Sequence, residues 1–558
     1  MHRFLYLLFC LPACGQTMCP ATPAYSICDI TFDVPGTAPH DAELNAEFRG
    51  PSLRTFLVRA FRSAGNRLTV RFSPFEAGTW DIRLSSTLPQ FHDKQLQMTA
   101  TPSDSNGWIE PANLHHFRYT GGAALAALTP PHLWVGDTLP SHLSGSTFES
   151  WVMERARAGV NHLRVPVPNF MEESAFDELD VRLGFLNKQN IIADLVLTPP
   201  KGDRQSREAF FQYVIARCAA RNATWVILDD FEKYDHAPDL VREISGYLDE
   251  DPFHHPRTAG AQVTSAVFAD EKWLQVRQYG SANWDISAVE DQIYGKPAVS
   301  VIKADSPDDF RHQLWNATMS GTYPEAAATD GATLSYLAVW QKTLADTRHW
   351  ELEPFFDADN ARGLSLPQTE YLLYIEKPGP VTVRLDGKHK WNVAWINPLD
   401  GKVDESKDLK DENFSGSPPD NSHDWVLHIY REGHKEGLKS YHFESRPVLL
   451  QDVEVDAAKV PFEITRPSGD FISPTTAVPY ATKLKRETKA SRNMIYLWTG
   501  EVTADGEGYR VLGTGSSGEF KVPPGIVRHF PATLHVRVYG LNGLGKLYSL
   551  DQNFGLTQ

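Results

Sequence analysis

Cysteine and positive charge are both scarce in this 558-residue sequence. It has five cysteines, and its 54 lysines and arginines stand against 70 aspartates and glutamates, which leaves a formal net charge of -16 at pH 7. This balance offers no basic stripe for phosphates or anionic lipid, so we expect no nucleic-acid partner. No cysteine or histidine spacing is typical of a zinc site, and His254 and His255 are predicted to be loop residues. We therefore expect no metal and no cofactor.

The apolar run at the start of the chain, from Phe4 to Leu11, is too short to span a bilayer permanently. Arg3 precedes it and small residues follow it, a pattern that predicts a secretory signal over residues 1–18. The segment LPAC, which ends at Cys14, also resembles a bacterial lipoprotein box, with ordinary cleavage as the alternative. We expect a secreted, periplasmic or cell-surface protein whose one membrane contact would be a lipid anchor at Cys14.

The remaining composition describes a folded protein of several domains. A chain of 558 residues is too long for one hydrophobic core, and its 41% hydrophobic and 22% charged residues exclude disorder. The aromatic richness suits a binder of sugars, although most of the tryptophans are expected in cores. Beyond the signal, Cys19 and Cys28 can pair in an oxidising compartment, and Cys218 is expected to be a small buried core residue.

Residues 25–120 show the period-two alternation of β-strands. Segments such as TFLVRAF and RLTVRFSP alternate apolar with polar residues and are separated by Gly, Pro and Ser. This pattern predicts an N-terminal, immunoglobulin-like β-sandwich.

Residues 121–364 alternate apolar strands with helices of 3.6-residue periodicity. Strands such as VNHLRVPV, IIADLVL and TWVILDD each precede an amphipathic helix, and Ser146 with Glu149 predicts a capping box for a helix that ends at Gly159. About eight such units predict a (β/α)8 TIM barrel. A doubly wound open sheet is the rival, but no Gly-rich phosphate loop follows the first strand.

Strands return after the predicted barrel. EYLLYIEKPGPVTVRL, KWNVAWINPLDGKV and DWVLHIYRE predict a small β-domain over residues 365–450, and later segments predict an immunoglobulin-like β-domain over residues 451–558. The predicted fold is therefore multidomain, with an N-terminal β-sandwich, a central (β/α)8 barrel and C-terminal all-β domains.

Four carboxylates crowd the end of the fourth predicted barrel strand, in TWVILDDFEKYD. A barrel presents its reacting groups at the C-terminal ends of its strands, so Asp229 and Asp230 are expected at the active-site face. Like charges nearby predict a raised pKa for Asp230, which would keep it protonated as a general acid. A second carboxylate about 5 to 5.5 Å away would suit retaining hydrolysis of a glycosidic bond, and a wider gap would suit inverting hydrolysis.

Other residues near the predicted strand ends are candidates for substrate binding. Asp137 is alternatively the cap of a turn, and Arg164 is alternatively a structural ion-pair partner. Aromatic side chains can stack on sugar rings, but core packing is the favoured alternative for Trp134. Asp229 and Glu232 are alternatively hydrogen-bond partners or helix N-terminal charges. The substrate-binding candidates are Asp137, Trp134, Arg164, Asp229, Tyr279 and Trp284.

Taken together, these segments resemble the apiosidase-like glycoside hydrolase group of bacteria. The resemblance is carried by RFSPFEAGTWDIRL, LWVGDT, WVMERARAGVNHLRV, FDELDVRLGFLNKQNI, VIARCAARNATWVILDDFEKYD, DEDPFHHPRT, FRHQLWNATMSGTYP and TRHWELEPFFD, in this order. It implies the same three-part architecture, with a C-terminal module whose family label is collagen-binding. It also implies a secreted enzyme acting on plant-type polysaccharide, with Asp230 as acid/base and a carboxylate after strand seven as nucleophile.

The sequence departs from this pattern at strand seven. Members of the group have a Glu shortly after a KP dipeptide, whereas this chain reads KPAVSVIKAD, with Val301 to Lys303 at the expected position. Without a second carboxylate, nothing obvious stabilises an oxocarbenium-like centre or activates water. Either another acid substitutes, with Asp305, Asp285 and Glu232 as candidates, or catalysis is lost.

Two hypotheses of different class therefore stand. The first is a hydrolase that cleaves a glycosidic bond of a poly- or oligosaccharide, with Asp230 as general acid/base. The second is a non-catalytic carbohydrate-binding or scaffold protein that kept the fold. Adhesion to protein through residues 366–558 is a third, weaker idea.

Overall fold

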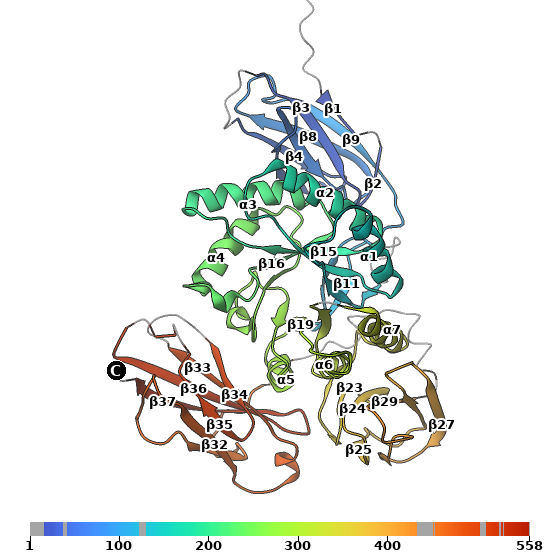
Figure 1. The fold of residues 1–558 in the computed structure, drawn as a ribbon, viewed down its shortest axis with the longest axis vertical. Helices are drawn as coiled ribbons and strands as arrows, with labels where there is room; N and C mark the ends of the chain where they lie inside the picture. The colour runs from blue at the N-terminus through green and yellow to red at the C-terminus, as the bar shows by residue number, and fades with distance from the viewer. Residues whose placement is uncertain are drawn as a thin grey trace, which may run out of the picture.

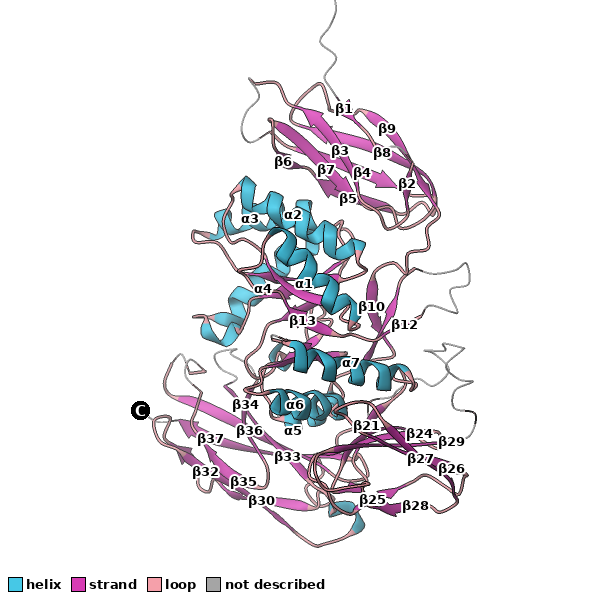
Figure 2. Cartoon of the chain, turned by 45° about the vertical axis from the view of Figure 1, so that its right-hand side comes forward, coloured by secondary structure: helices cyan, strands magenta, loops and turns pink. Residues whose placement is uncertain are grey.

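The computed structural model describes most of the chain, in four regions that follow the chain order (Figure 1). An N-terminal β-region lies at one end, a barrel lies in the middle, and two further β-regions lie side by side at the other end. Almost all helices belong to the middle region (Figure 2). Cys14 and most of the predicted signal lie outside the described residues, which are 16–19, 21–36, 42–121, 130–327, 329–431, 433, 450, 452–502, 509–523, 526–527 and 529–556.

The N-terminal region consists of two sheets that share one hydrophobic cluster. Alternate side chains of each strand turn inward, and the rings of Phe48 and Phe72 stack across the cluster with centroids 3.9 Å apart. Cys19 and Cys28 form a disulfide, as predicted. The first sheet contains β1 (Gln16–Thr17), β3 (Cys28–Asp33), β7 (Arg67–Phe72) and β6 (Phe61–Ser63); the second contains β2 (Thr22–Pro23), β9 (Gln95–Thr101), β8 (Gly78–Ser86), β4 (Leu44–Arg49) and β5 (Thr55–Arg59).

The middle region is an eight-stranded parallel barrel of the TIM type. Each strand pairs with its chain neighbours except β17 with β18, and the first pairs with the last, an order that a doubly wound sheet does not have. The backbone N–H groups of Gln275 and Val276 donate to the carbonyl of Arg257 at 3.0 and 3.1 Å and close the barrel. The strands are β13 (Gly136–Thr138), β14 (His162–Pro166), β15 (Ile192–Leu197), β16 (Ala223–Ile227), β17 (Arg257–Ala259), β18 (Arg277–Tyr279), β19 (Ala298–Ile302) and β20 (Tyr323–Ala326).

The barrel helices agree with the periodicity except at the start of the first one. The helix before Gly159 begins after Ser144, because Gly145 adopts a φ of +52° that turns the chain early, so the predicted Ser146 and Glu149 capping box is wrong. Between β17 and β18 the described chain forms the 3-10 turn η4 (Ala266–Phe268) in place of an α-helix. The helices are α1 (Gly145–Arg157), α2 (Glu173–Lys188), α3 (Arg204–Cys218), α4 (Ala237–Tyr247), α5 (Trp284–Ile293), α6 (Pro307–Met319) and α7 (Gly331–Ala345), with 3-10 turns η2 (Phe231–Lys233) and η3 (Leu248–Glu250). Cys218, at the end of α3, is a free buried cysteine, as predicted.

A small sheet closes the end of the barrel at which the strands begin. It consists of β10 (Ile109–Ala112), β11 (His116–Tyr119) and β12 (Pro131–His132). Phe117 from this sheet packs with Trp134 and with the first inward residues of the barrel strands, such as Val299. This end of the barrel is therefore a packed apolar core, and we call the opposite end, at which the strands terminate and TIM barrels carry their active sites, the barrel mouth.

The two C-terminal β-regions pack against barrel helices α5 and α6. Leu364 and Tyr374 join the main barrel core, while Leu541 packs with Ile286 and Val289 of α5. The first region contains β21 (Glu353–Phe355), β22 (Ala358–Asp359), β23 (Arg362–Leu366), β24 (Glu370–Ile375), β25 (Val381–Arg384), β26 (Trp391–Ile396), β27 (Val403–Leu409), β28 (Asn413–Gly416) and β29 (Trp425–Arg431). The second contains β30 (Phe462–Arg466), β31 (Phe471–Ile472), β32 (Val478–Leu484), η6 (Lys489–Ser491), β33 (Ile495–Val502), β34 (Arg510–Thr514), β35 (Ser517–Phe520), β36 (Ala532–Leu541) and β37 (Leu547–Leu556).

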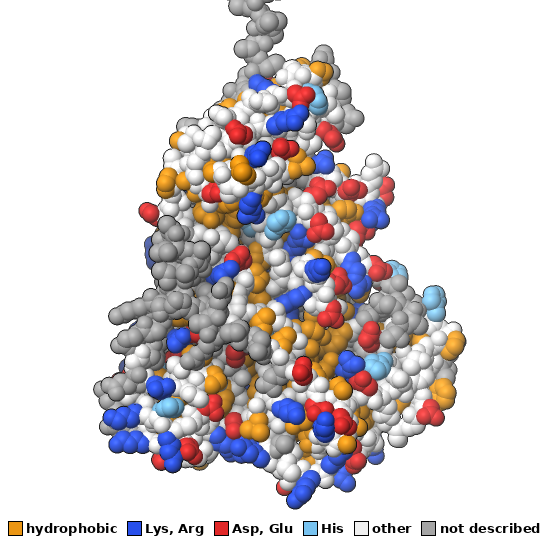
Figure 3. Space-filling view, turned by 180° about the vertical axis from the view of Figure 1, so that it is seen from behind, with side chains coloured by type: hydrophobic (Ala, Val, Ile, Leu, Met, Phe, Trp, Pro, Cys, Tyr) orange, Lys and Arg blue, Asp and Glu red, His pale blue; other side chains and the backbone are white. Residues whose placement is uncertain are grey.

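The molecular surface carries mixed charge. Acidic and basic side chains lie next to one another over the face shown in Figure 3. Within the described part of the chain, every helix is too short or too polar to cross a bilayer.

Candidate functional site

The end of β16 places the predicted acids at the barrel mouth. Leu228 and Asp230 both adopt positive φ angles, of 59° and 51°, which turn the chain sharply out of the strand. The turn lies against the next strand end, where a Cβ on Gly260 would meet the carbonyl oxygen of Leu228 at 2.2 Å. Phe231 then donates its backbone N–H to the carbonyl of Gly260 at 2.7 Å. The positive φ angles and the lack of space for a side chain at residue 260 together fix the position of Asp230.

Asp230 is held by two lysines. Lys303 donates from Nζ to Asp230 Oδ1 at 3.2 Å, and Lys233 donates to Oδ2. Lys303 follows β19, and the alternation from Val299, which packs in the barrel core, places the Lys303 side chain on the same inward side. The residue at the position expected for the second carboxylate is therefore a cation in contact with the first.

These contacts decide the ionisation of Asp230. Burial alone would raise the pKa of the Asp230 carboxyl, but the hydrogen bonds and charges of Lys233 and Lys303 outweigh it and lower the pKa below its ordinary value. The predicted raised pKa is therefore wrong. At neutral pH the side chain is a carboxylate without a proton to donate, and its residue is only 8% exposed.

Arg164 forms a buried hub just below the mouth. Its guanidinium donates to Gln278 Oε1 at 3.0 Å and to Asp229 Oδ1 at 2.8 Å, and its Nε lies 3.4 Å from Glu325 Oε1. Arg164 is 4% exposed, whereas the side chain of Asp229 is 62% exposed. The structure thus gives Arg164 the ion-pair role that the sequence left open, and Asp229 is the one member of the network that solvent reaches freely.

Two further acids lie inside the barrel that sequence reasoning missed. Glu325 is fully buried on β20, and Asp194 is fully buried on β15, where it accepts hydrogen bonds from Thr224 at 2.6 Å and His162 at 2.9 Å. Burial, as the largest effect, raises the pKa of both carboxyl groups. The sequence does place both acids within apolar strands. Which side of each strand faces the inside of the barrel could not be decided without the barrel register.

Asp137 does not face the mouth. It is completely buried on the outer side of β13, where its carboxylate lies 3.4 Å from Nε of Arg155 on α1 and accepts hydrogen bonds from Thr329 and from the N–H of Thr138. Burial raises its pKa to about 6 despite these partners. Asp137 therefore joins a strand to a helix, and the substrate contact predicted for it is not supported by its position.

The three alternative acids also have other partners or positions. Glu232 accepts backbone N–H groups of Gln262 at 2.8 Å and Val263 at 3.1 Å, which ties the turn after β16 to the loop after β17. Asp285 pairs with Arg362 of the neighbouring β-region at 2.7 Å. Asp305 is exposed in the turn that leads into α6. None of the three contacts Asp230 through a hydrogen bond in the described part of the chain.

The aromatic candidates are divided between core and surface. Trp134 is 3% exposed and stacks on His162 with ring centroids 3.5 Å apart, so it is the core residue that the sequence favoured. Tyr279 is buried, and its hydroxyl accepts a hydrogen bond from Arg277 at 2.6 Å. Only Trp284, half-buried at the start of α5, keeps surface for a ligand.

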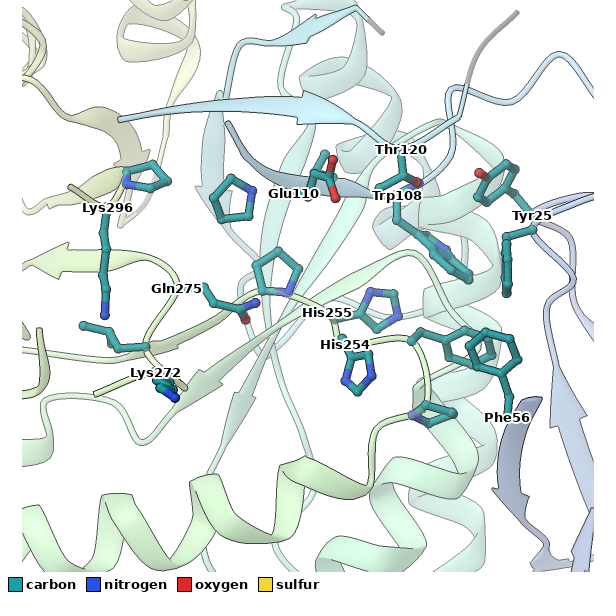
Figure 4. A pocket seen from close by; sticks show the side chains of 18 of the residues that line it. Tyr25, Phe56, Trp108, Glu110, Thr120, His254, His255, Lys272, Gln275 and Lys296 are labelled. Atoms are coloured by element: carbon teal, nitrogen blue, oxygen red, sulfur yellow. The ribbon is translucent and has the colours of Figure 1, made fainter. Parts of the chain in front are cut away.

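A hollow lies at the opposite end of the barrel from Asp230. This basal cleft, of about 690 Å³, separates the N-terminal region from the loops that precede β17, β18 and β19. Figure 4 shows Lys272, Lys296 and Gln275 toward one side and Tyr25, Trp108 and Phe56 toward the other. Its aromatic rings contact one another edge to face, as Trp108 and Phe253 of the barrel do at 4.8 Å, so they serve the packing of the two regions.

Comparison with known proteins supports the fold. The chain matches no family model and no curated protein sequence. It is similar to the crystal structure of a candidate glycoside hydrolase from Bacteroides vulgatus ATCC 8482, with a TM-score of 0.62 and 17% identity over 74% of this chain and 100% of that one. A second solved structure, named as a glycoside hydrolase, has a TM-score of 0.51 and 13% identity over 59% of this chain and 98% of that one. The chain has a glycoside hydrolase-like fold.

Proposed function

We propose that this protein binds carbohydrate at the mouth of a glycoside hydrolase-like barrel without cleaving it through Asp230 and a strand-seven carboxylate. The observation that carries the proposal is the Lys303–Asp230 ion pair. Hydrolysis at this site would need a proton on one carboxyl group and a second carboxylate across the glycosidic bond. The chain has a deprotonated Asp230 and an ammonium group in their place.

The mouth keeps groups that suit a sugar ligand. The side chains of Lys233, Lys303 and Asp229 are 59%, 51% and 62% exposed. Ammonium groups donate hydrogen bonds to sugar hydroxyls and carboxylates accept them. The three residues follow barrel strands, which hold side chains more rigidly than long loops do. These exposed groups support binding, because they offer directed hydrogen bonds that a packed barrel end would lack.

The substrate class and location follow from the resemblance to the apiosidase-like group. We infer a secreted or cell-surface protein that engages plant-type polysaccharide, either released after cleavage of the predicted signal or anchored by lipid at Cys14. The two solved structures described above carry glycoside hydrolase names, which supports carbohydrate as the ligand class.

Hydrolysis is the second candidate function, and one observation favours it. Burial raises the pKa of Glu325, so its carboxyl group carries a proton at neutral pH. Glu325 and Asp229 both contact Arg164. In this candidate function the protonated Glu325 would be the general acid and the ionised Asp230 would be the carboxylate partner. The sequence prediction gave the acid role to Asp230. Glu325 is 1% exposed, so this function requires the side chains around it to move.

One experiment separates these functions. The full chain is tested against a panel of soluble plant polysaccharides by affinity electrophoresis, and the same mixtures are assayed for new reducing ends. We expect retardation by at least one polysaccharide, several-fold weaker binding in Lys303→Ala, unchanged binding in the matched basal-cleft variant Lys272→Ala, and no new reducing ends. Absence of binding across the panel would contradict the proposal, and reducing ends that disappear in Asp230→Asn would establish the second candidate.

A further inference from the structure

A buried cluster of metal-ligating side chains lies outside the mouth, beside the small sheet that closes the barrel. His115 precedes β11, Asp291 belongs to α5, and Glu353 begins β21, so the cluster joins three segments that are far apart in the sequence. One ligand atom from each residue lies within 4.8 Å of the other two. His115 Nδ1 is 2.7 Å from Glu353 Oε2 and 3.6 Å from Asp291 Oδ2.

His116 borders this group of three and is the candidate for a fourth ligand. Its Nε2 lies 3.3 Å from Glu353 Oε1. His116 Nε2, Glu353 Oε1 and Asp291 Oδ2 are all buried and have no hydrogen-bond partner among the described residues. Buried polar atoms without partners are rare and costly, and an ion is one of the few groups that satisfies two carboxylate oxygens and an imidazole nitrogen together.

The surrounding hydrogen bonds orient these atoms inward. His115 Nε2 lies 3.2 Å from the carbonyl oxygen of Tyr294, an acceptor, so Nε2 carries a proton, while the Nδ1 proton bonds the Glu353 carboxylate at 2.7 Å and is the one that an ion would displace. His116 Nδ1 is held by the hydroxyl of Tyr323 at 2.8 Å, which leaves Nε2 available. Arg277 donates to Asp291 Oδ1 at 2.8 Å and leaves Oδ2 unpartnered. Metal-binding histidines and carboxylates are typically oriented by such outer contacts.

The chain also makes room for Asp291. A Cβ on Gly321 would meet the carboxyl carbon of Asp291 at 2.8 Å, and Gly321 has a φ of +87°, which other residues rarely adopt. A cavity of about 30 Å³ borders the cluster and is lined by His115, His116 and Glu353 among others. The space is too small for an organic ligand but is of the size that an ion or a water molecule needs.

The separations suit a transition metal. With metal–ligand bonds of about 2.0 to 2.2 Å, neighbouring ligand atoms of a tetrahedral site lie roughly 3.3 to 3.6 Å apart. The 3.6 and 3.3 Å separations agree with this geometry, and the 2.7 Å separation between His115 and Glu353 has to widen by several tenths of an ångström. Two imidazoles with two carboxylates favour a first-row divalent transition metal over Ca²⁺ or Mg²⁺, which prefer oxygen ligands only.

We propose that His115, His116, Asp291 and Glu353 bind one divalent transition-metal ion, with Zn²⁺ as the probe of choice. The side chains of His115 and Asp291 are almost fully buried and that of Glu353 is 23% exposed, so we assign the ion a structural role: it fastens the barrel-closing sheet and α5 to the first strand of the next β-region. This site differs from the sequence expectation of no metal, because its ligands come from segments whose spacing follows no recognisable pattern.

The test is metal analysis of the intact purified chain. After incubation with ZnCl₂ and extensive dialysis, we expect about one zinc per chain by mass spectrometry of the elements and an anomalous diffraction peak at the zinc edge between the four side chains. The conservative variant Glu353→Gln should lose at least tenfold in zinc affinity, while His254→Ala, an exposed histidine elsewhere, should keep it.

Two results would overturn the proposal. One is less than a tenth of a zinc per chain after this treatment, with only a water molecule at the cluster. The other is zinc content that is the same in Glu353→Gln and in the unchanged chain. Because Glu353→Gln can itself disturb folding, circular dichroism of each variant is recorded together with its metal content. If Glu353→Gln is unfolded, the presence or absence of the anomalous peak in the unchanged chain decides the proposal.

Discussion

Lys303 at the end of β19 reaches across the barrel mouth and donates to Asp230 after β16, over 3.2 Å. The two residues occupy the positions at which the resemblance to the apiosidase-like group expects two carboxylates. In place of two carboxylates that repel each other, the chain has a carboxylate and an ammonium group that attract each other. Asp230 is therefore ionised, whereas the sequence predicted that it would be protonated. The predictions below test this ion pair and the buried networks beneath it.

Removal of the Lys303 charge should make the free energy of unfolding less dependent on pH in the acidic range. Asp230 has a lowered pKa in the folded chain, so the stability it contributes is present above the unfolded-state value of about 3.9 and is lost as pH falls through the folded-state value. Because Lys303 is half-exposed, we expect Lys303→Met to cost about 1 kcal/mol or less at pH 7, and the difference from the unchanged chain to disappear as pH falls through the lowered pKa of Asp230. Urea denaturation at a series of pH values measures the difference in free energy of unfolding. For Lys272→Met, in the basal cleft, this difference should not change with pH.

Arg164 should matter more for stability than its partner Glu325. Arg164→Met leaves Asp229 and Glu325 without their buried cation and is expected to cost about 3 kcal/mol. Glu325→Gln should cost about 1 kcal/mol or less, because burial already favours the uncharged form of Glu325. Chemical denaturation followed by tryptophan fluorescence measures both variants. The opposite order of effects would show that Glu325 is ionised in the folded chain.

Glu232 should hold a loop, with no part in chemistry. Its two oxygens accept the N–H groups of Gln262 and Val263, so Glu232→Ala is expected to raise the hydrogen-exchange rates of these two amides and to cost about 1 to 2 kcal/mol. Mass spectrometry of peptic peptides covering residues 258–266 measures the exchange. The exposed neighbour Asp235 supplies the control, since Asp235→Ala should leave exchange in this peptide unchanged.

Asp137 should behave as a structural residue. Asp137→Ala leaves the buried Arg155 without this carboxylate and is expected to lower stability by about 3 kcal/mol, whereas Asp305→Ala, at an exposed turn, should change it by less than about 0.5 kcal/mol. Molecules of Asp137→Ala that remain folded should bind polysaccharide as the unchanged chain does. Lost binding with unchanged melting temperature would return Asp137 to the ligand site.

The architecture was largely predictable, because its signals are local. IIADLVL and TWVILDD are apolar enough to mark buried parallel strands, and the helices between them follow the 3.6-residue period. The helix missing between β17 and β18 was equally readable, since the segment 260–276 contains no such period. The start of α1 was misplaced because Gly145 allows a turn that capping rules do not consider.

The site was less predictable, because its chemistry depends on distant pairs. Sequence identified Asp230 and noticed Lys303 as a departure, but the contact between them follows from barrel closure over 73 residues. Glu325 and Asp194 were hidden for the same reason: whether an alternating acid points inward depends on the register of the whole barrel. The four ligands of the proposed metal site lie on three separate segments, which no spacing rule connects.

The most direct test of the account is a long incubation of the unchanged chain with whichever polysaccharide it binds. The account predicts saturable binding by calorimetry, weakened several-fold in Lys303→Ala, together with a constant number of reducing ends over several days. Reducing ends that accumulate in proportion to protein concentration, and that fall to background in Asp230→Asn, would contradict it.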